Sequence, residues 1–314
     1  MSVQTLVHVA TASDPWWERM FSFDNYGALL ALVHNSLLAG AVLGLVGGLV
    51  GVFVMQRDMA FAVHGISELS FAGAAAALLF GLDVAAGSVA GSLLAAIVIG
   101  LLGSRARDRS SIIGVLMPFG LGLGVLFLAL YPGRAANKFG LLTGQIVAVD
   151  DTRLSWLLSI SAVVVVSLLV IWRPLTFASV DPDVAAARGV PTRALSLVFM
   201  LLLGLAVALA VQVVGALLVL SLLITPAAAA TRVSASPLVV PLLSVLFAVV
   251  SAVGGILLAL GGNVPISPYV TTISFVIYVV CRVVGRRRSR RGWVHRPASG
   301  TPGARTEEAA EPVV

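Results

Sequence analysis

Charged side chains are scarce in this sequence. Asp, Glu, Lys and Arg make up 11% of its 314 residues, whereas a soluble domain carries about 25%. Hydrophobic residues make up 59% of the chain. So few charges could not cover the surface of a soluble globular protein, so the composition excludes that class. It predicts an integral membrane protein of the cell membrane.

Lysine and cysteine are almost absent. Lys138 is the single lysine, so the chain has no G-K-[ST] phosphate loop, and it also lacks the H-E-x-x-H and G-x-S-x-G motifs. These absences argue against an enzyme, and they exclude nucleotide hydrolysis by this chain alone. Cys281 is the single cysteine, which excludes an internal disulfide. The net charge of +6 comes from arginines clustered in loops, which is typical of a membrane protein and predicts no nucleic-acid partner.

Long apolar runs fill most of the chain. A helix needs about 20 apolar residues to cross the hydrocarbon core. The sequence therefore predicts an all-α, polytopic membrane protein with eight or nine transmembrane helices. The sixth and seventh runs are nearly continuous, and Gln212, Gly215 and Pro226 interrupt them, so they form either two spans or one span plus a half-helix. The nine runs cover residues 27–55, 62–82, 84–103, 112–131, 154–172, 194–211, 213–231, 238–261 and 267–285.

The basic loops predict the orientation. Nine crossings put all of these loops in the cytoplasm if the N-terminus is outside and the C-terminus inside. Three domains follow: residues 1–25 as an N-terminal interfacial segment, 26–285 as the transmembrane domain, and 286–314 as a basic and then disordered tail that touches membrane lipid. The basic positions are Arg57, Arg232 and the arginines within 104–111, 173–193 and 282–291.

Two ionisable residues lie within the second apolar run. His64 and Glu68 are four residues apart, so a helix places both on one face. A charged carboxylate in the middle of the bilayer costs about 2.5–3.5 kcal/mol, so Glu68 needs a partner, water or a proton. Imidazole and carboxylate are ligands for zinc, manganese or ferrous iron. The alternative is a His–Glu hydrogen bond that only packs helices together. We expect His34 to be a packed or interhelical polar residue.

The basic loop 173–193 contains the pattern of a short helix. Asp181 or Asp183 is a candidate N-cap, a run of small residues follows, and Gly189 is a candidate stop. This predicts one short amphipathic helix between two spans. A simple structured connector is the alternative.

Three stretches resemble the permease subunits of the zinc, manganese and iron ABC importers, the metal-uptake ABC-3 family. They are "VVGALLVLSLLITPAAAATRV" (213–233), "DPDVAAARGV" (181–190) and "FAVHGISELSFAG" (61–73). The resemblance covers residues 25–285. It implies that a separate ATP-binding subunit docks on the loop through Asp181, Pro182, Asp183, Ala187 and Gly189. It further implies an extracytoplasmic metal-binding protein and a homodimer with the path at its interface.

The third stretch departs from the family pattern. Where the family has an aspartate and then a histidine, this chain has His64 and then Glu68. The resemblance implies that the pair are pore ligands in exchanged order, and that they bind a transported divalent ion, zinc or manganese and possibly iron, rather than a permanent cofactor. Two alternatives remain open: a proton-coupled secondary metal transporter, and an ABC importer permease for a chelated metal or a vitamin.

Overall fold

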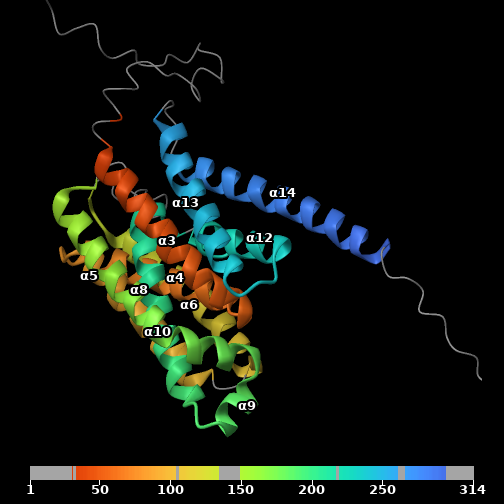
Figure 1. The fold of residues 1–314 in the computed structure, drawn as a ribbon. Coiled ribbons are helices and arrows are strands. Elements are labelled where there is room, and N and C mark those ends of the chain that lie inside the picture. The colour runs from red at the N-terminus through yellow and green to blue at the C-terminus, as the bar shows by residue number, and fades with distance from the viewer. Residues whose placement is uncertain are drawn as a thin grey trace, which may run out of the picture.

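The computed structural model describes residue 30 and residues 33–103, 106–133, 149–216, 219–260 and 266–294. The predicted interfacial segment 1–25 and residues 295–314 lie outside these ranges. Every regular element in the described ranges is an α-helix, and Figure 1 shows most of the helices packed side by side as one bundle, from which α14 extends away. The prediction of an all-α protein is confirmed.

Eight helices in the described ranges are long and apolar enough to cross a membrane, which confirms a multi-pass membrane protein with eight or nine spans. Their apolar length follows from the runs seen in the sequence, because a helix satisfies its own backbone hydrogen bonds inside lipid. They are α3 (His34–Gln56), α4 (Ala60–Leu79), α5 (Val84–Leu102), α6 (Ala106–Leu130), α8 (Asp151–Val180), α10 (Thr192–Val214), α13 (Val239–Ala259) and α14 (Ile266–Val294).

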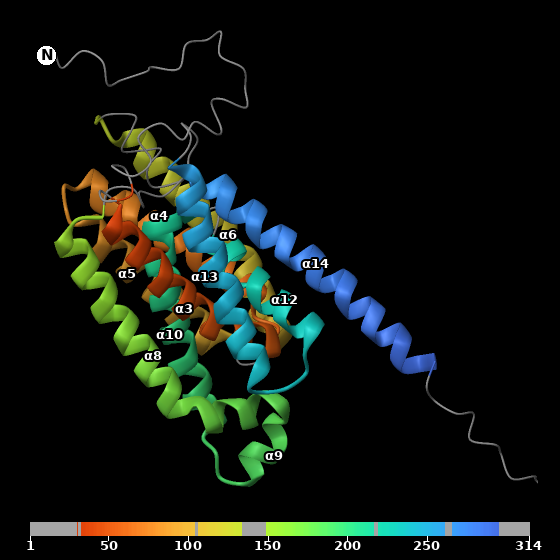
Figure 2. The same ribbon diagram turned by 45° about the horizontal axis from the view of Figure 1, so that its top comes forward.

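The predicted seventh span is broken. Its residues form two short helices, α11 (Val219–Leu223) and α12 (Thr225–Val233), which together are too short to count as a full span. Pro226 lies in the first turn of α12, where a proline is tolerated because its missing N–H is not needed. Figure 2 shows that α12 leads the chain back toward the side of the bundle where α9 (Pro182–Ala187) lies. The half-helix alternative therefore describes this region.

Three helices form the centre of the bundle. Most residues of α3, α4 and α10 are buried, whereas about one third or less of the residues of α5, α6, α8, α13 and α14 are buried, and each of these five helices has exposed apolar side chains. In a membrane protein such exposed apolar faces suit contact with lipid. The helix that carries His64 and Glu68 is therefore an inner helix, surrounded by α5, α6 and α10.

Glycines let the inner helices approach closely. A Cβ atom added to Gly48 of α3 would lie 2.6 Å from the Cα atom of Val245 in α13, and one added to Gly44 would lie 2.8 Å from Cα of Val249. Such distances leave no room for a side chain. These glycines therefore allow the close helix packing that is typical of membrane proteins.

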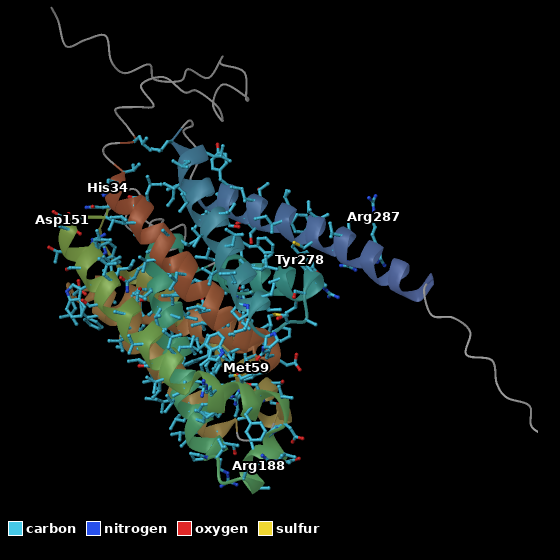
Figure 3. All side chains as sticks on the ribbon, in the orientation of Figure 1. His34, Met59, Asp151, Arg188, Tyr278 and Arg287 are labelled. Atoms are coloured by element: carbon cyan, nitrogen blue, oxygen red, sulfur yellow. The ribbon has the colours of Figure 1, made fainter. Side chains whose placement is uncertain are left out.

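The two ends of the bundle differ. Figure 3 places Met59 and Arg188 toward one end and His34 and Asp151 toward the other. His34 is exposed at the start of α3, so our expectation that it is a packed residue is wrong. The last helix also differs from the prediction: α14 continues through the basic stretch to Val294, so the predicted tail 286–314 begins as helix. Arginine has a high helix propensity, which favours this continuation.

The membrane orientation is a testable prediction. We expect Ser110 and Arg188 to face the cytoplasm and Gly133 to face outside, because basic loops stay inside. All three residues are exposed, whereas Cys281 is buried, so single cysteines can be introduced in a Cys281→Ser background. The measurement is labelling by a membrane-impermeant thiol reagent. Labelling of position 188 from outside intact cells would reverse the predicted orientation.

Candidate functional site

The pair His64 and Glu68 lies in the first half of α4. The helix begins at Ala60, directly after the turn in which Asp58 has a positive φ of 50°. Nε2 of His64 lies 3.6 Å from Oε1 of Glu68, one helical turn along. The two side chains therefore share a face, as their spacing predicts.

The distance between His64 and Glu68 argues against the alternative in which the two side chains form only a hydrogen bond. An N–H···O hydrogen bond joins atoms about 2.7–3.2 Å apart, and the 3.6 Å separation of His64 and Glu68 is longer. Nδ1 of His64 is buried and has no hydrogen-bond partner in the described part of the chain. His64 and Glu68 are therefore in close contact without a hydrogen bond between them. Both side chains are of a type that can bind a metal ion, and neither is occupied by bonding to the other.

Glu68 is enclosed by neighbouring helices. Its side chain is 5% exposed, against 27% for that of His64. A Cβ atom added to Gly120 of α6 would lie 3.0 Å from the carbonyl carbon of Glu68, so α6 packs directly on the backbone at this turn. Within the described ranges, His64 is the one ion-pair partner of the carboxylate. A buried carboxylate without a charged partner is costly, so this site favours a cation or a proton.

As a metal site, the pair would be incomplete on its own. No group of three or more His, Cys, Asp or Glu residues within the described ranges could hold a metal ion. Two protein ligands hold a divalent ion weakly, and a weak site allows release.

The short helix α9 (Pro182–Ala187) is built as the sequence predicts. The carboxylate of Asp181 accepts a hydrogen bond of 3.0 Å from the N–H of Val184, which makes Asp181 the N-cap. Gly189 has a positive φ of 83° and ends the turn, a conformation that glycine adopts without strain. Ala185 is buried against the bundle.

The outer surface of α9 is available for contact. Asp183, Ala187 and Arg188 are exposed, and Figure 1 shows α9 at the extreme end of the bundle. A helix held by one buried residue, with its remaining side chains exposed beyond the apolar spans, is a suitable docking surface for another protein. It lies far from His34 and Asp151, at the end that also carries Met59 (Figure 3).

One residue of the site was missed by sequence reasoning. Ser67 is fully buried, and its Oγ donates a hydrogen bond of 2.8 Å to the carbonyl oxygen of Ala216, at the break between α10 and α11. The sequence signal was modest: a serine directly before the acidic residue of an apolar helix. The sequence shows the interruption at Gly215, but it does not show that this segment contacts α4.

Comparisons with known proteins give a consistent picture. Residues 30–285 match the sequence profile described as the ABC 3 transport family. The chain is 31% identical over 225 residues to the manganese transport system membrane protein MntC of Halalkalibacterium halodurans, covering 71% of this chain and 77% of that protein. It is 28% identical over 254 residues to the high-affinity zinc uptake system membrane protein ZnuB of Haemophilus influenzae, covering 80% and 97%.

A solved structure has the same fold. The chain is similar to PsaBC from Streptococcus pneumoniae, solved in complex with a Fab, with a TM-score of 0.75 and 27% identity. The similarity covers 85% of this chain and 98% of the other. The arrangement of spans described above is therefore shared with that protein over almost its whole length.

Proposed function

Because the chain belongs to the ABC 3 transport family, we propose that it is the membrane permease subunit of an ATP-driven importer of a divalent transition-metal ion. Manganese and zinc are the first candidates, since the relatives named above are manganese and zinc transport proteins; iron is a further candidate. The observation that carries the proposal is the pair of side chains able to bind a metal, His64 and Glu68, on an inner helix that has no other ionisable residue.

The pair acts as a transient ligand set for the ion. A neutral imidazole and an ionised carboxylate each donate one electron pair to the cation, whose charge offsets the cost of burying the carboxylate of Glu68. Waters or groups from a second copy of the chain complete the coordination. Two protein ligands are enough to select a transition metal and few enough to release it when neighbouring helices move.

Energy comes from a separate ATP-binding subunit that docks on α9. Asp181, Pro182 and Asp183 start the helix, Ala187 offers a small exposed side chain, and Gly189 turns the chain into α10. The helix α10 runs from this loop to the break beside Ser67. An extracytoplasmic binding protein delivers the ion, and two copies of the permease form the path at their interface with the N-terminus outside and the C-terminus inside.

Two other functions are weighed against this one. A proton-coupled secondary metal transporter would use Glu68 and His64 as proton carriers and need no ATPase, and the exposed helix α9 would then have no partner. An importer of a chelated metal or a vitamin would need a roomy polar cavity. The close packing of α6 against Glu68 through Gly120 favours a bare ion.

Replacing either ligand should weaken transport. We expect Glu68→Gln, which removes the charge, and His64→Ala, which removes the nitrogen donor, each to lower uptake about tenfold or more, since loss of even an outer-shell group costs 10–100-fold in metal affinity. The measurement is uptake of radioactive Mn²⁺ and Zn²⁺ by cells that lack their own importer, with membrane levels matched. His34→Ala is the matched control, because His34 is exposed at the start of α3.

The exchanged order of the ligands makes a sharper prediction. His64→Asp combined with Glu68→His restores the order usual in the family on the same helix face, with one carboxylate and one imidazole. We expect this double variant to recover more uptake than either single replacement. A double variant no better than the singles would reject the exchange, and full activity in both singles would reject the metal role.

Variants at the end of α9 and in the turn that follows it test whether this helix is a docking site. In Gly189→Pro, φ is forced to about −65°, although Gly189 has a φ of 83° and its N–H donates to the carbonyl of Ala186 at 3.0 Å. We expect this variant and Ala187→Glu to lower co-purification of the ATP-binding subunit and metal uptake about tenfold while the permease still inserts. Gly189→Asn, which tolerates positive φ, is the control and should keep both. Normal uptake in the first two variants would make the loop a connector only.

A further inference from the structure

The break between α10 and α11 lies beside the proposed metal pair. α10 ends at Val214, Gly215 has a positive φ of 92°, and α11 begins at Val219. The last carbonyl groups of a helix have no partner within that helix. In an apolar interior each unsatisfied carbonyl is costly, so a broken helix needs donors from other elements.

Three buried serines from two other helices supply these donors. Ser67 of α4 donates to the carbonyl oxygen of Ala216 at 2.8 Å. From α14, Ser267 donates to that of Val214 at 3.1 Å, and Ser274 donates to that of Ser221 at 2.8 Å. The irregular segment is therefore held on one side by α14 and on the other by the helix that carries the metal pair.

The hydrogen bond of Ser67 is not the default for a serine in an apolar helix. Such a serine can bond the carbonyl one turn back in its own helix, as Ser179 does with Leu175 and Ser251 with Phe247. Ser67 bonds instead to irregular backbone 149 positions away. The hydroxyl of Ser67 could bond within its own helix, but it instead joins α4 to the segment between α10 and α11.

The position of Ser67 connects three parts of the molecule. It directly precedes Glu68 on α4, so its hydroxyl and the carboxylate belong to neighbouring residues. Its acceptor follows the end of α10, an unbroken helix of 23 residues that starts three positions after Gly189. At 1.5 Å per residue α10 is about 34 Å long, a rigid rod between the α9 loop and the break.

We propose that Ser67 is a positioning residue that couples movement of the α9 loop to the metal pair through its hydrogen bond to Ala216. This inference rests on the proposed function. When the α9 end of α10 is displaced, the carbonyl of Ala216 moves with the rod, and Ser67 transmits the displacement to the turn that holds Glu68. Without this bond, less of the displacement reaches that turn, and the ligand geometry follows the docking state less closely.

The test compares two buried serines of the same helix. Ser67→Ala removes the hydroxyl and little volume. Ser70→Ala is the matched control: Ser70 is also fully buried in α4, but its hydroxyl bonds to the carbonyl and the hydroxyl of Ser88 in α5, at 3.0 and 2.8 Å. The hydroxyl of Ser88 donates to the carbonyl of Ala208 at 3.5 Å, so this link reaches the interior of α10 rather than the break. Permease, ATP-binding subunit and binding protein are reconstituted in liposomes, and uptake of radioactive Mn²⁺, Mn²⁺ affinity of the permease and phosphate release are measured.

We expect Ser67→Ala to bind Mn²⁺ within about threefold of the parent protein and to hydrolyse ATP, while Mn²⁺ moved per ATP falls about fivefold or more. Ser70→Ala should stay near the parent ratio. Ser67→Cys, whose thiol is a weak donor, should give an intermediate ratio. A purely structural role would lower the amount of assembled complex and leave the ratio unchanged.

An unchanged ratio in Ser67→Ala, or an equal fall in Ser70→Ala, overturns the inference. If Ser67→Ala does not accumulate in the membrane, Ser67→Cys decides, and a parent-like ratio there overturns it as well. Failure of the proposed function looks different: the parent complex then moves no metal, or Glu68→Gln and His64→Ala match it. If the parent complex transports metal and the ligand variants do not, the proposed function stands. The result for Ser67→Ala then tests the coupling alone.

Discussion

The structure depends on one constraint, that every backbone carbonyl in an apolar interior needs a donor. Regular spans meet it internally, but the chain after Val214 does not, because Gly215 turns it out of the helix. The hydroxyls of Ser67, Ser267 and Ser274 meet the constraint there. Their placement fixes how α4 and α14 lie against α11, so the break organises the helices around it and brings irregular backbone next to the only buried acidic residue in the described ranges, Glu68.

A second consequence concerns the charge of Glu68. A carboxylate is tolerated in an inner helix when small residues let other helices close around it and a cation or proton is available. Gly120 of α6 and Gly91 of α5 bring backbone against α4 at Glu68 and Leu69. This tight packing therefore surrounds Glu68 with the backbone and apolar side chains of its neighbours.

The sequence predicted where the helices lie along the chain better than it predicted which helices are neighbours in space. Hydropathy located the spans, and the cap at Asp181 with the glycine at Gly189 located α9, because these signals are local. It did not show that α4 is an inner helix and α14 an outer one, since lipid-facing and core-facing residues are equally apolar in a membrane protein. The bond between Ser67 and Ala216 joins residues 149 positions apart, and no local pattern encodes it.

The depth of the pair within α4 adds a final constraint on the path. His64 lies four residues and Glu68 eight residues from the start of the helix at Ala60, so they are about 6 Å and 12 Å from its α9 end. The remaining eleven residues of α4 lead to the opposite end. The pair therefore lies nearer to the end at which α4 begins, and α10 spans the distance from the α9 loop to the break beside the pair. Under the proposed function, α10 is thus the element that reaches from the docking loop to the pair, and its position can decide between holding the ion and releasing it.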